Sequence, residues 1–297
     1  MNPPDVPRGP DTPEVLGVPD MPDGLGMDAA TLQRALKLVY QYTGITLAEG
    51  KKTMLQSRMR QRMRQLGLPS YRAYLDWLES TPAERQPFID VVTTHQTTFF
   101  RTPKVWDYFR EQFLPQYVQT HGQNSVLRLW SAAASTGEEA CSMAMCCEEF
   151  KRQQPRFNYE ILATDISTEV LAQAQQGEYS GATVTHFRAK HPELFARYNH
   201  SPSSERFVLP KALSQRIRFQ PCNLMQPQQP WKEHFDLVFL RNVLIYFSPE
   251  DARRIVQRLA PTLRHTGQLI IGESESLSGQ EVPFQFIQPQ VYRRSSL

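Results

Sequence analysis

A carboxylate, Asp165, follows the short apolar run of residues 159–163, where it could bind a nucleoside. Nucleotide-binding α/β folds place an acidic side chain at the end of the second strand, and this side chain accepts hydrogen bonds from both ribose hydroxyls. The alternative is that Asp165 caps the next helix, although Ser167 suits that role better. We therefore expect Asp165 to bind a ribose.

A second group of residues with potential for chemistry follows the apolar run 126–130. Residues 131–139, Ser-Ala-Ala-Ala-Ser-Thr-Gly-Glu-Glu, are mostly small and lead into an expected helix, so a ligand can approach the backbone closely. The stretch lacks G-x-G-x-x-G, which argues against a pyrophosphate site and against a nicotinamide-dependent dehydrogenase. Glu138 or Glu139 suits a cationic ligand, such as one with an ammonium or sulfonium group. Alternatively, both acids merely complement the helix dipole.

The third group is the polar pair Arg241 and Asn242, which follows the apolar run 235–240. The apolar stretch continues beyond the pair to Phe247. Burial of such a pair is costly unless it lies at a hydrated site. We therefore expect both side chains at the edge of a ligand site.

The elements that must position these residues follow from the pattern after residue 125. Short apolar runs alternate with amphipathic helices, which is typical of the α/β class with a parallel sheet and crossover helices. Ligands of such open sheets bind beyond the carboxyl ends of the strands, so the three groups should lie together. The expected strands cover residues 126–130, 159–163, 217–219, 235–240 and 268–271, with helices at 138–151, 168–175 and 249–263.

The chain is expected to divide into a tail and two domains. Residues 1–27 contain seven of the 23 prolines and almost no periodic apolar pattern, so we predict a disordered tail. Apolar residues at helical spacing predict an all-α domain over residues 28–118, with Asp28 as the first N-cap. The α/β domain should occupy residues 126–297. The stretch of about 179–214 is too long for an ordinary connection, so we expect an inserted subdomain there.

Composition and charge narrow the functional class. The chain of 297 residues has a net charge of +3, which does not by itself suggest nucleic acid. No stretch approaches the ~20 apolar residues of a membrane-spanning helix, and the start does not read as a signal peptide, so we expect a cytoplasmic protein. The four cysteines fit neither a disulfide framework nor zinc-ligand spacing, and no metal site is expected.

Several segments together resemble the CheR family of chemotaxis receptor methyltransferases. The resemblance covers about residues 28–295 and implies a Rossmann-like methyltransferase sheet with a small β-subdomain insert, preceded by an all-α N-terminal domain. It also implies transfer of a methyl group from S-adenosylmethionine to glutamate carboxylates of a chemoreceptor in sensory adaptation, with S-adenosylhomocysteine as the product. The similar segments are residues 93–101 (Thr-Thr-His-Gln-Thr-Thr-Phe-Phe-Arg), 130–139, 163–166 (Ala-Thr-Asp-Ile), 223–224 (Asn-Leu), 240–247 (Leu-Arg-Asn-Val-Leu-Ile-Tyr-Phe) and 272–276 (Gly-Glu-Ser-Glu-Ser).

The resemblance further implies roles for individual residues, with Asp165 at the ribose and the Asn-Leu pair beside the adenine. Arg101 and Tyr246 would line the acceptor side as the catalytic residues. Arg101 could instead hold the methionine carboxylate of the cofactor, because a guanidinium binds carboxylates bidentately. His95 occupies a position where the family usually has asparagine, so no ligand contact is assigned to it. The implied cofactor contacts are Thr97, Arg101, Glu138, Asp165, Asn223, Leu224, Asn242 and Val243.

The implied reaction needs no general base. A glutamate is already ionised at neutral pH and is itself the nucleophile. The enzyme mainly has to hold the carboxylate in line with the sulfonium methyl group and exclude water.

A basic helix is expected at about residues 49–66. Lys51, Arg58 and Arg62 project on one side beside an apolar stripe and without a compensating acid, whereas Arg60 and Arg64 point to roughly the opposite side. Such a run of charge is usually a solvated face. The resemblance implies that this helix recognises the helical methylation region in the cytoplasmic part of the receptor. The residues assigned to receptor binding are Lys51, Arg58, Arg62 and Arg64.

The expected insert bears on how the receptor is found. In family members that bind a pentapeptide at the receptor's C-terminus, the subdomain has a Gly-rich turn at which the peptide adds as an extra strand. The matching residues 197–207 contain no glycine, and Pro202 lacks an N–H that strand addition could use. The chain therefore resembles the pentapeptide-independent branch.

Two other functions fit part of the pattern. A non-catalytic module could bind S-adenosylmethionine or S-adenosylhomocysteine and signal by protein contact, but the set of implied site residues favours an enzyme. Methylation of nucleic acid calls for a Pro-Pro-Tyr or Pro-Cys dipeptide after the run 235–240 and a basic stripe interleaved with aromatic residues. The sequence shows neither.

Overall fold

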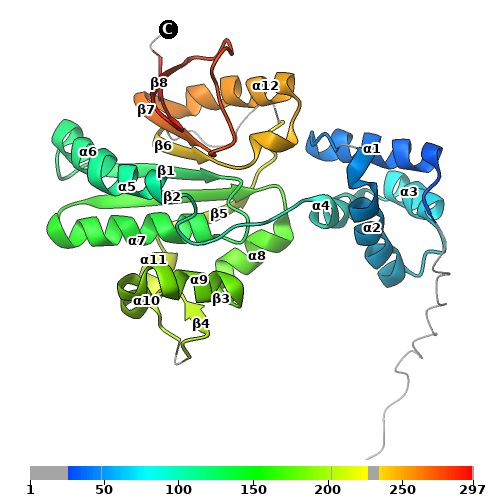
Figure 1. Ribbon diagram of the computed structural model, residues 1–297, viewed down its shortest axis with the longest axis horizontal. Coiled ribbons are helices and arrows are strands. Elements are labelled where there is room, and N and C mark those ends of the chain that lie inside the picture. The colour runs from blue at the N-terminus through cyan, green and yellow to red at the C-terminus, as the bar shows by residue number, and fades with distance from the viewer. Residues whose placement is uncertain (1–25, 48, 202, 227–233, 296–297) are drawn as a thin grey trace, which may run out of the picture.

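The computed structural model describes residues 26–47, 49–201, 203–226 and 234–295, in which a small helical domain is joined to a larger α/β domain (Figure 1). Nearly all of the predicted N-terminal tail lies outside the described residues. Within those residues, no helix has the length and apolar character needed to cross a membrane.

The helical domain has its own core. The Asp28 carboxylate accepts the Thr31 N–H at 2.7 Å, so the predicted cap is present. On the second helix, the apolar side chains of Leu55, Met59 and Met63 are buried at i, i+4 and i+8 spacing. The prediction of an all-α domain is confirmed. Its helices are α1 (Ala29–Thr43), α2 (Lys52–Leu66), α3 (Tyr71–Ser80) and α4 (Arg85–Val92), with 3-10 turns at Glu49–Lys51 and Pro82–Glu84.

The helix that begins at Pro103 packs on the sheet and not on the helical domain. The ring centroids of Trp106 and Phe109 lie 5.5 and 5.8 Å from that of Phe239 in the sheet. The domain boundary expected at residue 118 therefore lies earlier, in the linker after α4. An amphipathic pattern shows that one face of a helix is buried, but not which core buries it. The helix comprises α5 (Pro103–Tyr108), a π-helical turn (Phe109–Phe113) and α6 (Leu114–His121).

Seven strands form the main sheet in the order β5-β2-β1-β6-β7-β9-β8. Five of them run parallel and the last two form an antiparallel edge, which confirms the α/β class. The chain moves outward from β1 to one side and then returns to β6 on the other, so a ligand crevice is expected between β1 and β6. The strands are β1 (Val126–Ala132), β2 (Asn158–Asp165), β5 (Ile217–Pro221), β6 (Phe235–Leu240), β7 (Leu263–Ile271), β8 (Phe284–Gln288) and β9 (Val291–Arg294).

Helices cover both faces of this sheet (Figure 1). α7 (Glu138–Gln153) and the α5–α6 helix share one buried core with the sheet, whereas α12 (Pro249–Leu259) belongs to a second core on the other face. α8 (Thr168–Gln176) follows β2 and contacts α4 of the helical domain.

The inserted subdomain is present between α8 and β5, as expected. It has a two-stranded antiparallel sheet, β3 (Glu178–Ser180) and β4 (Arg206–Val208). The Phe99 ring of the interdomain linker stacks on Phe187 and meets Phe207 edge-on, at centroid distances of 4.6 and 5.3 Å. The insert therefore supports the linker. Its helices are α9 (Ala182–Lys190), α10 (Pro192–Tyr198) and α11 (Lys211–Ser214).

Candidate active site

A cavity of about 590 Å³ lies at the carboxyl ends of β1, β2 and β6, between the two domains. This volume is in the range of small-molecule sites. Loops after the strands and the interdomain linker form most of the wall, and the helical domain forms the rest. The sequence analysis missed this last contribution, because no local pattern connects these residues with the strand ends. They are Thr43, Ile45, Thr46, Leu47, Lys51, Met54 and Val92.

Hydrogen bonds join the domains on the α8 side of the cavity. The Asp90 carboxylate of α4 accepts the backbone N–H and the hydroxyl of Thr168 at 2.9 and 3.3 Å. Gln86 Nε2 donates to the Ile166 carbonyl at 3.0 Å. Thr168 is the first residue of α8, so a carboxylate from one domain satisfies a free N–H at a helix start of the other.

A second set of contacts joins the domains on the opposite side. Thr46 N–H donates to the Tyr246 carbonyl at 2.9 Å, and Asn223 Nδ2 donates to the Tyr42 carbonyl at 3.0 Å. Asn223 Oδ1 accepts the Met225 N–H at 2.9 Å. Asn223 lines the cavity, but its amide is also part of the domain junction.

The Asp165 carboxylate is buried at the end of β2 and faces the cavity. Its Oδ2 accepts the Ser135 N–H at 2.8 Å and its Oδ1 accepts the Ser167 N–H at 3.0 Å. Ser167 caps α8, because its hydroxyl accepts the Val170 N–H. The competing role for Asp165, that of helix cap, is therefore filled by Ser167.

The loop between β1 and α7 has a tightly constrained backbone. Ala133, Ser135 and Gly137 have φ angles of 70°, 51° and 94°. A Cβ on Gly137 would lie 2.9 Å from the Ala174 Cβ and 3.0 Å from the Tyr179 hydroxyl. Glycine at 137 therefore allows α8 and the insert to approach this loop.

The two neighbouring glutamates at the start of α7 point in different directions. Glu138 is buried and its carboxylate accepts the Thr136 hydroxyl at 2.6 Å, but the residue is not part of the cavity wall. Burial raises the pKa of the Glu138 carboxyl above its usual value. Glu139 lines the cavity instead. Glu138 therefore does not lie with the other expected cofactor contacts. Glu139, the other acid considered, does.

Glu139 is held by a buried ion pair with Arg241. Arg241 Nη1 lies 3.0 Å from Glu139 Oε2, and the Ser131 hydroxyl donates to Oε1 at 2.7 Å. Arg241 Nη2 donates to the Arg101 carbonyl at 2.8 Å. The Arg241 side chain is 2% exposed, so its main role in this geometry is to connect β6, α7 and the linker.

The linker carries Thr97 and Arg101 into the cavity wall. Arg101 is half-buried, and its Nη1 donates to the Gln96 carbonyl at 3.1 Å. Trp106 Nε1 donates to the Arg101 carbonyl at 2.9 Å, which fixes the linker at the start of α5. The remaining guanidinium donors of Arg101 are available to a carboxylate.

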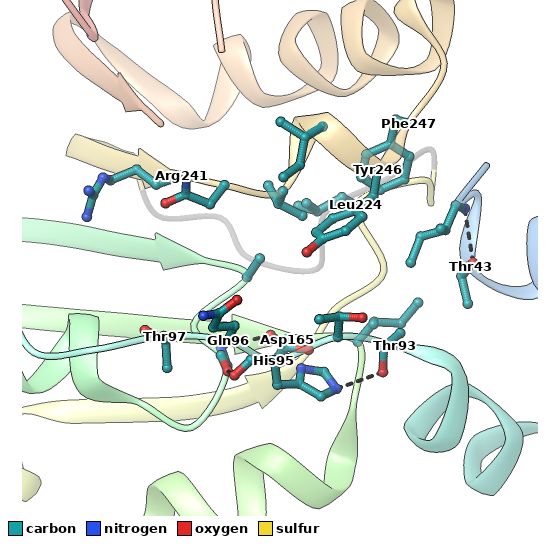
Figure 2. Close-up of a pocket in the computed structure, with 18 of the residues that line it drawn as sticks. Thr43, Thr93, His95, Gln96, Thr97, Asp165, Leu224, Arg241, Tyr246 and Phe247 are labelled. Carbon is teal, nitrogen blue, oxygen red and sulfur yellow. Dashed lines mark hydrogen bonds between the residues drawn. The ribbon is translucent and has the colours of Figure 1, made fainter. Parts of the chain in front are cut away.

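His95 lies beside Asp165 in the lower wall of the cavity (Figure 2). Its Nε2 is 2.7 Å from the Thr93 hydroxyl, and its carbonyl accepts the Ser135 hydroxyl at 3.0 Å. Burial lowers the pKa of the imidazole below its usual value. The burial therefore favours the neutral form of the side chain.

The loop after β6 forms the opposite wall. Asn242, with a φ of 56°, and Val243 line the cavity, followed by a 3-10 turn from Leu244 to Tyr246. Figure 2 shows the Tyr246 ring across the cavity from His95, with its hydroxyl pointing inward. The structure thus brings both proposed catalytic residues to the same cavity.

Two of the four residues assigned to receptor binding are engaged within the helical domain. Arg58 Nη1 donates to the Val92 and Thr93 carbonyls at 3.0 and 2.6 Å. Arg62 forms a bidentate pair with Glu84, at 2.8 Å from Nε and 2.7 Å from Nη2. The expectation that this side of the helix lacks a compensating acid is wrong, because Glu84 is brought there by α3 and the turn that follows it.

The other basic residues of this helix are more accessible. Lys51 is exposed and lines the cavity. Arg64 is exposed and Arg60 half-buried, and neither makes a hydrogen bond or ion pair with another described residue. The charge available for an outside partner therefore lies on Lys51, Lys52, Arg60 and Arg64.

The residues present fit S-adenosylmethionine as a ligand. A buried carboxylate, Asp165, has a face directed to the cavity and suits a ribose diol. Glu139 supplies an acidic group for the cationic end, and the unengaged guanidinium donors of Arg101 suit a carboxylate. Leu224 gives an apolar surface for a base.

Comparison with known proteins gives matches over both domains. The profile described as "CheR methyltransferase, SAM binding domain" matches residues 95–293, and that described as "CheR methyltransferase, all-alpha domain" matches residues 30–93. The "Chemotaxis protein methyltransferase" of Borreliella burgdorferi is 31% identical over 89% of this chain and 94% of that protein. The protein of the same name from Escherichia coli is 33% identical over 93% of this chain and 94% of its own length. "Chemotaxis protein methyltransferase 2" of Pseudomonas aeruginosa is 34% identical over 82% of this chain and 85% of its own.

Proposed function

The chain belongs to the CheR methyltransferase family and is an S-adenosylmethionine-dependent methyltransferase of chemotaxis, and on this premise we propose that it methylates glutamate carboxylates of a chemoreceptor. The products are a glutamate methyl ester and S-adenosylhomocysteine. The proposal places the protein in the cytoplasm, where the methylation region of such receptors lies.

The observation that carries the proposal is the gathering of the expected site residues in one cavity. Asp165 binds the ribose, and Asn223 and Leu224 lie beside the adenine. Glu139, in place of Glu138, faces the cationic end of the cofactor. The expected residues that line the cavity are Thr97, Arg101, Asp165, Asn223, Leu224, Asn242, Val243 and Tyr246.

The protein's part in the reaction is positioning. Bound S-adenosylmethionine supplies an electrophilic methyl group on a sulfonium. Arg101 and the Tyr246 hydroxyl hold the acceptor carboxylate, and the helical domain forms part of the cavity wall. No general base is needed, so His95 has no proton to remove from the acceptor, which is already ionised.

The acceptor enters beside Tyr246. Ile245 lines the cavity and is 52% exposed, and exposed Lys51 of the helical domain lines the same cavity. An exposed apolar side chain and a cation at one cavity suit an amphipathic helix that presents a glutamate.

Labelling tests the proposed reaction. The protein, incubated with methyl-labelled S-adenosylmethionine and receptor-containing membranes, should label the receptor, and mild base should release the label because esters hydrolyse. Label that survives base would place the methyl group on nitrogen and contradict the proposal. The family match argues against a non-catalytic signalling module. Binding of S-adenosylhomocysteine without any labelling of the receptor would be evidence for such a module.

We further propose that Arg60 and Arg64 attract the acidic methylation region, in place of Arg58 and Arg62. The double change Arg60→Glu and Arg64→Glu should lower kcat/KM for the receptor about tenfold or more, since charge reversal slows association with an acidic partner. The affinity for S-adenosylhomocysteine should stay within about twofold, because neither residue lines the cavity. Methylation rates at several receptor concentrations measure the effect.

Arg152 and Arg156 provide the matched control. Both are exposed on or just after α7, away from the cavity. Their double change to glutamate alters the net charge by the same amount. If both pairs of changes lower kcat/KM equally, the overall charge of the protein is responsible. The proposal that α2 binds the receptor would then be wrong.

The hydrogen bonds along the outer edge of β4 support the proposal that this protein belongs to the pentapeptide-independent branch. Val208 N–H donates to Asn199 Oδ1 at 3.1 Å, and the Val208 carbonyl accepts the His200 N–H at 3.1 Å. Arg206 N–H donates to the Ser203 carbonyl at 3.4 Å. The loop before β4 thus uses the backbone groups with which an added strand would pair.

Receptors with and without their C-terminal tails test this part of the proposal. Methylation rates should be equal for both, and peptides copied from receptor C-termini should not bind. Micromolar binding of such a peptide, or methylation that requires the tail, would contradict it. Pro202, whose missing N–H was part of the sequence-based prediction, lies outside the described residues.

A further inference from the structure

A carboxylate outside the cavity organises the loop that forms one of its walls. Glu275 lies in the turn after β7 and is not among the lining residues. Its Oε1 accepts the N–H groups of Val243 and Leu244 at 2.9 and 2.8 Å. Its Oε2 accepts those of Asn242 at 3.0 Å and Gly272 at 2.5 Å. Four backbone donors from two loops therefore converge on one side chain.

The loop needs such an acceptor because it leaves the sheet. The ladder between β6 and β7 ends at the pair Leu240 and Ile271, so the next N–H groups have no strand partner. Asn242 is in the left-handed region at φ 56°, which a side chain other than glycine adopts only when its surroundings hold it there. Successive N–H groups in this geometry form a nest for an anion, and Glu275 fills it.

The two loops are in direct contact at Gly272. A Cβ at this position would lie 2.7 Å from Glu275 Oε2 and 2.8 Å from the Asn242 N, so no side chain fits there. The 3-10 turn that carries Tyr246 starts inside the nest, with the Leu244 N–H bound to Glu275 and the Tyr246 N–H bound to the Val243 carbonyl. A shift of the Glu275 carboxylate therefore moves both the cofactor wall and Tyr246.

We propose that Glu275 is a positioning residue for cofactor binding and methyl transfer, acting through the backbone of residues 242–246. The inference rests on the proposed function, because it takes Asn242 and Val243 as cofactor contacts and Tyr246 as an acceptor contact. Glutamine is a poor substitute because its amide nitrogen would replace one carboxylate oxygen. That nitrogen is a donor, so it cannot accept the two N–H groups that the oxygen accepts. Aspartate keeps the negative charge, but its side chain is one methylene shorter, so the carboxylate lies farther from the N–H groups.

Replacement of Glu275 is tested by calorimetry with S-adenosylhomocysteine and by methylation kinetics. Glu275→Gln should weaken binding about tenfold or more, as expected for loss of an ordering contact behind a ligand site, and should also lower kcat. Glu275→Asp should recover part of both losses. Calorimetry does not depend on the acceptor, so it tests the inference even if the glutamate assay fails.

Two controls separate positioning from stability. Glu273→Gln removes the same charge from an exposed residue two positions away and should leave binding and kcat unchanged. Leu259→Ala makes a cavity in the core under α12 and should lower Tm while the folded protein keeps its affinity. Wild-type affinity and kcat in folded Glu275→Gln would overturn the inference. So would an affinity loss in Leu259→Ala as large as in Glu275→Gln.

Discussion

Replacing Arg62 by alanine is expected to lower the free energy of unfolding by about 3 kcal/mol, because the change leaves a buried carboxylate without its counter-ion. The Glu84 side chain is 4% exposed. Its remaining partner among the described residues is the Tyr74 hydroxyl, 3.0 Å from Oε1. Urea denaturation followed by circular dichroism measures the loss.

A second change tests whether the buried charge is the cause. Adding Glu84→Gln to the Arg62→Ala variant should restore much of the stability, because a neutral amide needs no counter-ion and its oxygen still accepts the Tyr74 hydroxyl. Arg64→Ala on the same helix should change the free energy of unfolding by less than about 0.5 kcal/mol, as at other surface sites. Equal losses at Arg62 and Arg64 would contradict the structural role of the pair.

The largest expected effect on binding is that of Asp165→Ala. We expect S-adenosylhomocysteine to bind about 1.5–3 kcal/mol more weakly, or roughly 10- to 150-fold in Kd, because the ribose hydroxyls lose a charged acceptor. The change also removes the acceptor of the Ser135 and Ser167 N–H groups. Ser135 has a φ of 51°, so the loop after β1 should relax when the carboxylate is absent. Calorimetric titration measures both affinity and stoichiometry.

Ser167→Ala is the matched control for Asp165. It removes the side-chain cap of α8 and should lower the free energy of unfolding by about 1 kcal/mol. The affinity for S-adenosylhomocysteine should not change, because Ser167 is not part of the cavity wall. If folded Asp165→Ala keeps its affinity, the carboxylate serves the backbone alone and the ribose assignment is wrong.

The positions of the strand ends could be predicted because they depend on local patterns. Buried parallel strands are short apolar runs, and the side chains that follow them share one edge of the sheet whatever the details of packing. Asp165, Asn242 and Val243 were found in this way or through the segments of the resemblance, and all three line the cavity. The α/β class follows from these short apolar runs alternating with helices, and the separate helical domain follows from apolar residues at helical spacing.

Only the tertiary structure decided in which direction each side chain points. It also decided which residues distant in the sequence become partners. Glu138 and Glu139 are neighbours on one helical turn, so the rotation of α7 against the sheet determines which of them faces the cavity. The acid that pairs with Arg62 lies 22 residues away at Glu84, beyond the reach of any helical spacing rule. The helix that begins at Pro103 has the apolar face of a bundle helix, and only packing shows that the sheet buries it. In each case a local pattern in the sequence identified the group, and the three-dimensional fold determined what the group contacts.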